Sequence, residues 1–253
     1  MKTIILLFLL AVSFTTGLAE ASVMPANAEQ SSVELEGQVL WQGRNDAAIP
    51  GDTGTRFSLR EILKSSTAGF RLEASYPLSE RSQLRGVFAP LTIQDSGTLL
   101  SPVSFQGSSF NTTEPIETIF KFNSYRLTYR YRFIQNDDWT LFAGLTAKVR
   151  DAKISLRQGS AFQEKANLGF VPLLYCAAAY HFNTDWQAEL EFDALAAPQG
   201  RAEDLRLALR KNFSVRGLSA ALGYRILEGG ADNKTVFTFA LFHYATASVG
   251  FEF

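Results

Sequence analysis

The stretch TVFTFALFHYATASVGFEF, residues 235–253, closes the sequence and decides the fold. Alternate positions carry apolar side chains, with Phe253, Phe251 and Val249 on one face. The other face is smaller and more polar toward the terminus, as at Ser248. A period of two over this length predicts a long β-strand. An unpaired terminal strand would be an aggregation-prone edge, so the pattern favours a barrel that closes onto its first strand.

The N-terminus has the pattern of a secretory signal peptide. The positive charge of Lys2 is followed by an apolar run at residues 4–14 and then by small residues. This run is too short for a membrane helix. Ala-x-Ala sites predict a signal peptide of residues 1–21, with cleavage after Ala28 as the alternative. We expect the barrel domain to cover residues 32–253.

Composition narrows the class of protein. The aromatic content is 13%, the formal net charge is −1, and the one cysteine, Cys176, cannot form an internal disulfide. After the signal peptide no run reaches the roughly 18 to 20 apolar residues that a membrane helix needs. A mature chain of about 230 residues fits one all-β domain. Nothing predicts a basic surface for nucleic acid.

Segments of about ten alternating residues recur along the mature chain, separated by turn residues. The clearest, residues 124–133, sets Leu127, Phe133 and three tyrosines on one face and three arginines on the other. An aromatic face suits lipid, and an arginine row suits a wet or salt-bridged lumen. The count is ten strands. Eight or twelve stay open, because residues 57–62 could form a strand and residues 83–92 alternate poorly.

Four local features interrupt this alternation. A possible capping box at Ser58 predicts a short helix that ends near Ser65. Residues 44–54 and residues 93–120 are predicted to be loops. Past Arg150 the apolar residues change parity, which predicts a bulge where that strand leaves the membrane.

The terminal strand resembles that of bacterial outer-membrane β-barrels, which end in Phe preceded by alternating apolar residues. The resemblance implies a closed antiparallel up-and-down transmembrane barrel in the outer membrane of a Gram-negative cell envelope. It also implies contact with outer-membrane lipid and lipopolysaccharide, and with the assembly machinery. Phe253, Phe251 and Val249 would then form the membrane-insertion signal. Aromatic residues beside the short turns are expected to form a periplasmic girdle: Tyr131, Phe133, Trp139, Tyr180, Phe182, Trp186 and Phe253.

Charged residues on the inward face of the predicted strands are the candidate site. The lumen-lining candidates are Arg126, Arg130, Arg132, Lys148, Arg150, Glu189, Glu191, Asp193, Arg206 and Arg210. Further inward charges are Glu34, Glu36, Glu73, Arg71, Arg85, Arg225 and Glu252. A barrel of eight to ten strands is little wider inside than its side chains, so most of these must pair with one another. The alternative is that surplus arginine forms a narrow path favouring small anionic solutes.

The sequence predicts no catalytic residues. The two histidines are His181 and His243. Neither has the His-x-Ser arrangement of lipid A deacylase barrels or the Asp-x-His pair of omptin proteases, and no nucleophile–base pair can be named by spacing. Two isolated histidines and one cysteine predict no metal site, and no motif predicts a cofactor.

The expected function is therefore a non-enzymatic barrel with a narrow charged lumen. It would act as a porin-like pore for small solutes or as a structural membrane component. One alternative is a surface-binding barrel that uses long extracellular loops at Arg44–Ser66 and Ile93–Phe120. Another is an outer-membrane enzyme acting on lipid or peptide.

Overall fold

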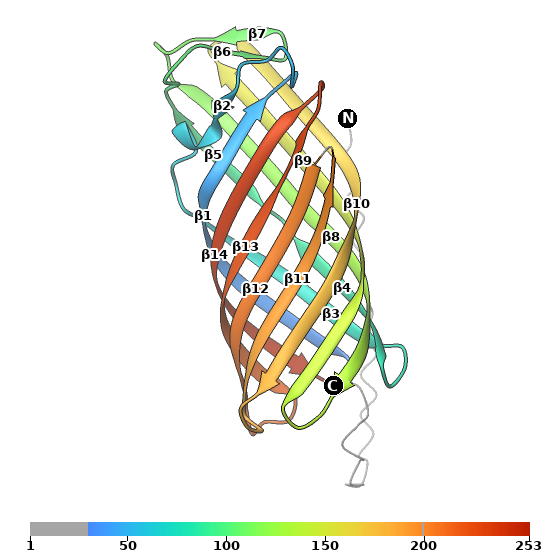
Figure 1. Cartoon of the computed structure of the whole chain (residues 1–253). Coiled ribbons are helices and arrows are strands. Elements are labelled where there is room, and N and C mark those ends of the chain that lie inside the picture. The colour runs from blue at the N-terminus through green and yellow to red at the C-terminus, as the bar shows by residue number, and fades with distance from the viewer. Residues whose placement is uncertain (1–29, 199) are drawn as a thin grey trace, which may run out of the picture.

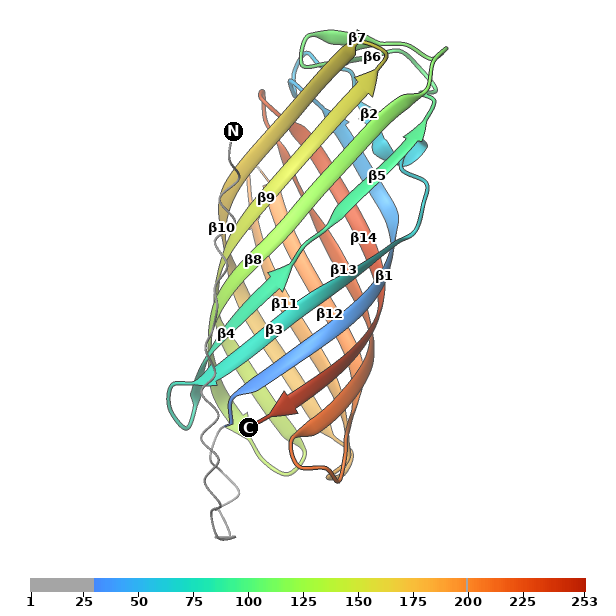
Figure 2. The ribbon, with the colours of Figure 1, turned by 180° about the vertical axis from the view of Figure 1, so that it is seen from behind.

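The computed structural model describes residues 30–198 and 200–253, which form a closed antiparallel β-barrel of ten strand positions (Figures 1 and 2). The predicted signal peptide lies outside these residues. The strands of the barrel are β1 (Ser32–Ala48), β3 (Thr67–Pro77), β4 (Ser82–Ala89), β5 (Thr92–Gly97), β8 (Ile116–Gln135), β9 (Trp139–Gln158), β10 (Ala161–His181), β11 (Trp186–Ala197), β12 (Gly200–Asn212), β13 (Leu218–Asp232) and β14 (Phe237–Glu252). β4 and β5 share one position because both pair with β8. The prediction of an all-β barrel of ten strands is confirmed.

The terminal strand closes the barrel. β14 pairs with β1 from Ser32 opposite Glu252 to Ala48 opposite Phe237. The register shifts once, between Gln42 and Arg44. This ladder removes the edge that the terminal strand would otherwise expose.

The side chains on the outer surface show whether water or lipid surrounds the barrel. Large apolar side chains stand exposed on each of the ten strand positions of the wall, such as Leu35 at 55%, Leu145 at 63% and Leu222 at 71%. A closed barrel with an outward apolar face is a membrane-spanning structure. No helix in the described residues has the length and apolar character of a membrane span.

The two ends of the barrel differ. The two ends of the described chain meet at one end of the barrel, where Ser31 and Phe253 exchange backbone hydrogen bonds of 3.1 and 2.9 Å. Short connections such as residues 78–81 and 136–138 lie at the same end. Short turns mark the periplasmic end of such barrels. Aromatic rings cluster there, with the ring centroids of Trp139 and Tyr180 4.9 Å apart and those of Phe251 and Phe253 6.2 Å apart. The predicted girdle residues are all exposed: Tyr131, Phe133, Trp139, Tyr180, Phe182, Trp186 and Phe253.

At the extracellular end, the predicted loops are more ordered than expected. β1 continues to Ala48, and residues 93–120 contain most of β5, the hairpin of β6 (Val103–Phe105) and β7 (Ser108–Phe110), and the start of β8. The predicted helix is wrong. β2 (Phe57–Ser58) is followed by the 3-10 turn η1 (Leu59–Glu61), which ends well before Ser65.

At the extracellular boundary of the membrane, the outer surface of the wall changes from apolar to polar and the inner surface changes from polar to apolar. On β9, outward side chains are apolar up to Val149 and polar or charged from Asp151 onward. Inward side chains up to Arg150 are polar apart from Phe142, and they become buried and apolar at Ile154 and Leu156. Below the boundary the barrel is therefore apolar outside, and above it the barrel is apolar inside.

This exchange corrects the bulge predicted past Arg150. β9 keeps one register with β10 along its whole length, and with β8 throughout this region. The side chains at even positions therefore keep pointing inward. What changes is their surroundings, from a polar lumen to an apolar interior.

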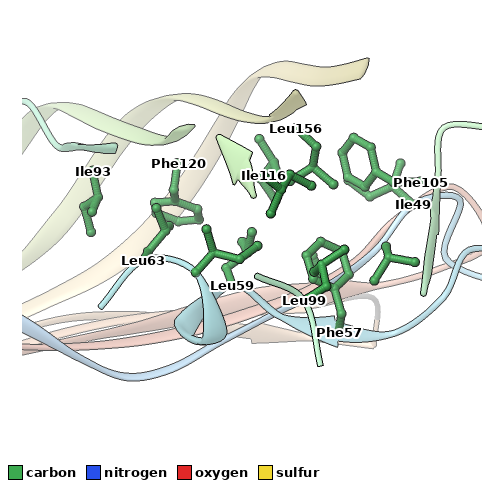
Figure 3. Close-up of a cluster of buried hydrophobic side chains, with 14 of the residues drawn as sticks. Ile49, Phe57, Leu59, Leu63, Ile93, Leu99, Phe105, Ile116, Phe120 and Leu156 are labelled. Carbon is green, nitrogen blue, oxygen red and sulfur yellow. The ribbon is translucent and has the colours of Figure 1, made fainter. Parts of the chain in front are cut away.

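The apolar interior above the boundary is a packed hydrophobic core (Figure 3). Its inner wall includes Phe242 of β14, and its cover comes from η1, β6 and β7. Phe105 and Phe110 are fully buried, and the rings of Phe57 and Phe105 meet edge to face at 6.3 Å. The extracellular loops thus fold into the barrel, and we call this cluster the apolar core.

Candidate functional site

The lumen contains a cavity on the periplasmic side of the apolar core. The cavity has a volume of about 650 Å³ and reaches the terminal end of the barrel at Glu252. Its walls include Glu34, Arg130, Tyr175 and Arg210. We call this cavity the vestibule. Its volume lies in the range of small-molecule sites, roughly 300–1,000 Å³.

Between the vestibule and the apolar core lies a layer of ion pairs that crosses the lumen. Its members are Glu36, Arg71, Glu73, Arg85, Arg126, Glu191, Asp193, Asp204, Arg206 and Arg225. Arg126 of β8 donates to Asp193 of β11 at 2.8 Å and to Asp204 of β12 at 2.5 Å. These three side chains are nearly inaccessible to water. We call this set the ionic layer.

The ionic layer is continuous because several acids bind two arginines. Asp204 also accepts from Arg225 at 2.8 Å, and Glu36 lies between Arg225 and Arg206. Unpaired charges inside a narrow barrel would be costly, and this mutual pairing avoids that cost. The layer joins strands from opposite sides of the wall and fills the section of lumen that it occupies.

A second group of ion pairs lies on one wall of the vestibule. Arg210 donates to Glu34 at 2.6 Å and to Glu189 at 2.5 Å. Arg206 also contacts both carboxylates, at 3.3 Å and 3.0 Å. Two acids thus face two arginines, so this wall is close to neutral.

The opposite wall of the vestibule carries an arginine of a different kind. Arg130 donates through Nε to Gln83 at 2.7 Å and through Nη2 to Ser75 at 3.1 Å. Its Nη1 lies 3.5 Å from the Tyr175 hydroxyl. All three partners are neutral, and no described carboxylate lies within 4.0 Å of Arg130. A guanidinium has five N–H groups, so two remain for a further acceptor.

Nine of the ten sequence candidates fall into three groups, and Arg132 lies apart from them. Arg126, Glu191, Asp193 and Arg206 belong to the ionic layer, of which Glu191 and Arg206 also reach the vestibule. Arg130, Glu189 and Arg210 line the vestibule only. Arg132 lies at the periplasmic rim, where it donates to the Glu80 carbonyl oxygen.

Lys148 and Arg150 form the third group, nearer the apolar core. The Lys148 ammonium lies 5.1 Å from the centroid of the Phe122 ring, and the side chain is 2% exposed. Arg150 donates to Asn167 on β10 at 2.6 Å. Neither has a carboxylate partner within ion-pair distance in the described chain.

Two important members of the lumen were missing from the sequence candidates. Asp204 shares the inward parity of Arg206 and Arg210, so extending the alternation of β12 by one step would have found it. Tyr175 lies in an apolar stretch without charged residues, residues 171–180, so the sequence carried no signal for a role in the lumen.

The two histidines lie in different surroundings. His181 Nε2 lies 3.0 Å from the Thr140 hydroxyl at the mouth of the vestibule, a contact between residues 41 positions apart. His243 lies on the outer face, as expected, where its Nδ1 is 2.6 Å from the Tyr224 hydroxyl and its ring stacks on Trp41 at 5.7 Å. Within the described residues, no cluster of three or more metal-ligating side chains occurs.

No protein-family model and no curated protein matches the chain. Among solved structures, the outer membrane protease OmpT from Escherichia coli has a TM-score of 0.49 and 10% identity, covering 88% of this chain and 97% of that one. The translocator domain of autotransporter NalP from Neisseria meningitidis has a TM-score of 0.46 and 12% identity, covering 90% of each chain. Ail, the attachment invasion locus protein of Yersinia pestis, has a TM-score of 0.39 and 12% identity, covering 88% and 100%.

These likenesses leave the activity open, and the class follows from the barrel itself. The wall is closed and antiparallel, its outer belt is apolar, and its aromatic residues gather beside short turns at the terminal end. Its lumen is polar where the outer surface is apolar. This combination is that of a bacterial outer-membrane β-barrel.

Proposed function

We propose that this protein is an occluded outer-membrane barrel that binds small anionic solutes in its periplasmic vestibule. The observation that carries the proposal is Arg130, a cation on the vestibule wall whose hydrogen bonds all go to neutral partners. The ionic layer and the apolar core lie beyond the vestibule. A solute would therefore enter and leave by the same mouth.

The filled lumen argues against an open diffusion pore. An ion crossing the barrel would have to pass the Arg126–Asp204 contact at 2.5 Å and then a core in which Phe242 and Leu156 are almost fully buried. Breaking buried ion pairs is strongly unfavourable, and an apolar core offers an ion no ligands. Passage would require both regions to rearrange.

The chemistry around Arg130 selects the class of ligand. The opposite wall pairs its acids with Arg206 and Arg210, so it contributes little net charge. The remaining N–H groups of Arg130 can bind a carboxylate or phosphate through two oxygens, a geometry that guanidinium favours. Tyr175 and Gln83 hold the guanidinium in place.

Calorimetry on the purified barrel in detergent, with inorganic phosphate and acetate as probes at low ionic strength, tests the proposal. We expect saturable binding that weakens by about tenfold in Arg130→Gln, the loss of one charge-assisted contact. The matched control is Arg201→Gln, which removes the same charge at the extracellular end. Equal affinity in wild type and Arg130→Gln, or the absence of saturable binding, would overturn the anion site.

Planar bilayer recordings test the occlusion separately. We expect no stepwise conductance from the wild-type barrel, because the ionic layer and the apolar core fill the lumen. Regular conductance steps from the purified protein would show that the lumen opens, and would favour a pore instead.

A further inference from the structure

β10 extends far beyond the strand beside it. It pairs with β9 from Ala161 to Tyr180, but with β11 only from Leu174 to His181. In the described chain, no strand pairs with Ala161–Leu173 on the side away from β9. Figure 2 shows this upper part of β10 reaching the β6–β7 hairpin, at the end of the barrel away from the C-terminus. The extracellular part of β10 is therefore a free sheet edge.

The turn before β10 fixes which backbone groups face this edge. Gly159 and Ser160 form a two-residue turn, so the flanking pair Gln158 and Ala161 exchange hydrogen bonds. Odd positions of β10 then bond to β9, and even positions face away. One of the outward acceptors is covered, because Gln106 Nε2 donates to the Glu164 carbonyl oxygen at 3.3 Å.

At its lower end, where the free edge meets the membrane, β10 has no unpaired backbone N–H group. Pro172 is an even position and has no N–H, so no unpaired donor is left where the edge approaches lipid. Its neighbour Leu174 is the first residue to pair with β11. The unpaired donors thus belong to positions above Pro172, where water or a partner can reach them.

Two large apolar side chains point outward from the lower part of the free edge, one opposite charged Asp151 and the other opposite apolar Val149 at the membrane boundary. Leu168 is 72% exposed and Phe170 67% exposed. Leu168 lies opposite Asp151, the first charged outward residue of β9. A long free edge flanked by large exposed apolar side chains marks an interaction surface, because soluble proteins normally blunt such edges.

The inward side of the edge is positive. Lys165 has no acidic partner in the described chain, and Arg150 donates only to Asn167. Arg150 lies opposite Gly169, and its Nη2 would be 3.1 Å from a β-carbon at that position. The missing side chain of Gly169 therefore lets the guanidinium of Arg150 reach across β10 toward the free edge.

We propose that the edge of β10 over Ala161–Leu173 binds an extended segment of a partner protein, which adds as a new strand in line with β11. Main-chain hydrogen bonds to the even positions hold the segment. Its acidic side chains face Lys165 and Arg150, and its apolar side chains lie beside Leu168 and Phe170. The occupant is thus a strand in which acidic and apolar residues alternate.

A second copy of this chain does not fit the edge. Two barrels in one membrane both direct β10 toward the periplasm, and each strand is tilted by roughly 35–45° from the membrane normal. Placed edge to edge, the two strands would cross at roughly 70–90° and could not form a ladder. A segment from outside the membrane has no such restriction.

The test uses a fluorescent ten-residue peptide of alternating glutamate and valine, and measures its anisotropy with the full barrel in detergent. We expect saturable binding to wild type that weakens by about tenfold in Ala166→Pro, which removes an N–H from the free edge. Proline is tolerated on an edge strand, so the barrel should stay folded, which circular dichroism checks. The matched control is Ala166→Ser, which keeps that N–H and should bind within about twofold of wild type.

Two further peptides separate strand addition from simple attraction. A peptide with N-methyl groups on alternate amides keeps its charge but cannot pair, and we expect it not to bind. An arginine–valine peptide should also fail, because Lys165 and Arg150 repel it. Equal binding to wild type and Ala166→Pro, binding of the N-methylated peptide, or no saturable binding to wild type would each overturn the proposal.

Discussion

Arg85 and Glu191 meet across the lumen, with Nη2 of the arginine 3.0 Å from Oε2 of the glutamate. Their strands β4 and β11 are not neighbours in the sheet, because β8, β9 and β10 lie between them. Arg85 also binds Glu73 on the adjacent strand and has no exposed surface. The contact therefore ties opposite walls of the barrel together through its interior.

Removing both acids of Arg85 should destabilise the barrel strongly. In the double variant Glu73→Gln with Glu191→Gln, a buried guanidinium loses its counter-charges, which costs about 3–5 kcal/mol of unfolding free energy. Adding Arg85→Met to that double variant removes the stranded charge and should recover much of the loss. Guanidinium unfolding in lipid vesicles measures all three proteins. A double variant as stable as wild type would contradict this account of the ionic layer.

The apolar core should behave like the core of a soluble protein. Phe242 is 1% exposed, and its ring centroid lies 5.5 Å from that of Phe120. Phe242→Ala should therefore cost about 3–5 kcal/mol, the loss typical of a truncated core aromatic. Phe162→Ala, at a side chain that is 43% exposed, is the control and should change stability little. Similar losses in the two variants would argue against a packed core.

The outward face of β9 should respond to charge according to depth. Leu145 is in the middle of the apolar stretch that ends at Val149, so Leu145→Arg should cost about 2–4 kcal/mol in lipid. Asp151→Arg lies past the boundary and removes a partly exposed pair with Lys121 and a 3.4 Å contact with Asn123, so it should cost about 1 kcal/mol or less. Unfolding in vesicles compares them. Equal penalties would place the boundary elsewhere.

Above that boundary, charge should be tolerated on the outer surface of the wall and should be unfavourable inside the barrel. Leu156 has no exposed surface, so Leu156→Glu would bury an unpaired carboxylate in the apolar core and disrupt the extracellular part. Its neighbour Arg157 is exposed, and Arg157→Glu should be tolerated. Limited proteolysis of intact cells reports on the extracellular part. Resistance of the Leu156→Glu protein equal to that of wild type would refute the reversal.

The wall of the barrel could be predicted because lipid makes period-two alternation strong. In residues 124–133, outward aromatic side chains and inward arginines differ so sharply that parity alone identifies both faces. The terminal strand adds the signal for closure, and the ladder between β1 and β14 confirms it. These inferences needed local sequence only.

The interior could not be predicted in the same way. Arg126 meets Asp193 and Asp204, which are 67 and 78 positions away, and alternation says nothing about partners at such distances. Past Arg150 the sequence shows apolar residues at inward positions. A bulge in the strand would give this pattern, and so would a change from a polar lumen to an apolar interior around an unbroken strand. Only the pairing of β9 with β10 distinguishes the two.

The exchange of polarity along β8, β9 and β10 also constrains how the molecule is assembled. The charged outer residues Lys121, Asp151, Lys153 and Glu164 finish on the far side of the bilayer, so each must be translocated across hydrocarbon. They stand as opposite charges, with Lys121 2.7 Å from Asp151 and Lys153 3.5 Å from Glu164. Hairpins that cross as preformed, mutually neutralised units avoid exposing isolated ions to lipid. Strands whose charged residues pair with one another are therefore expected to insert into the membrane together.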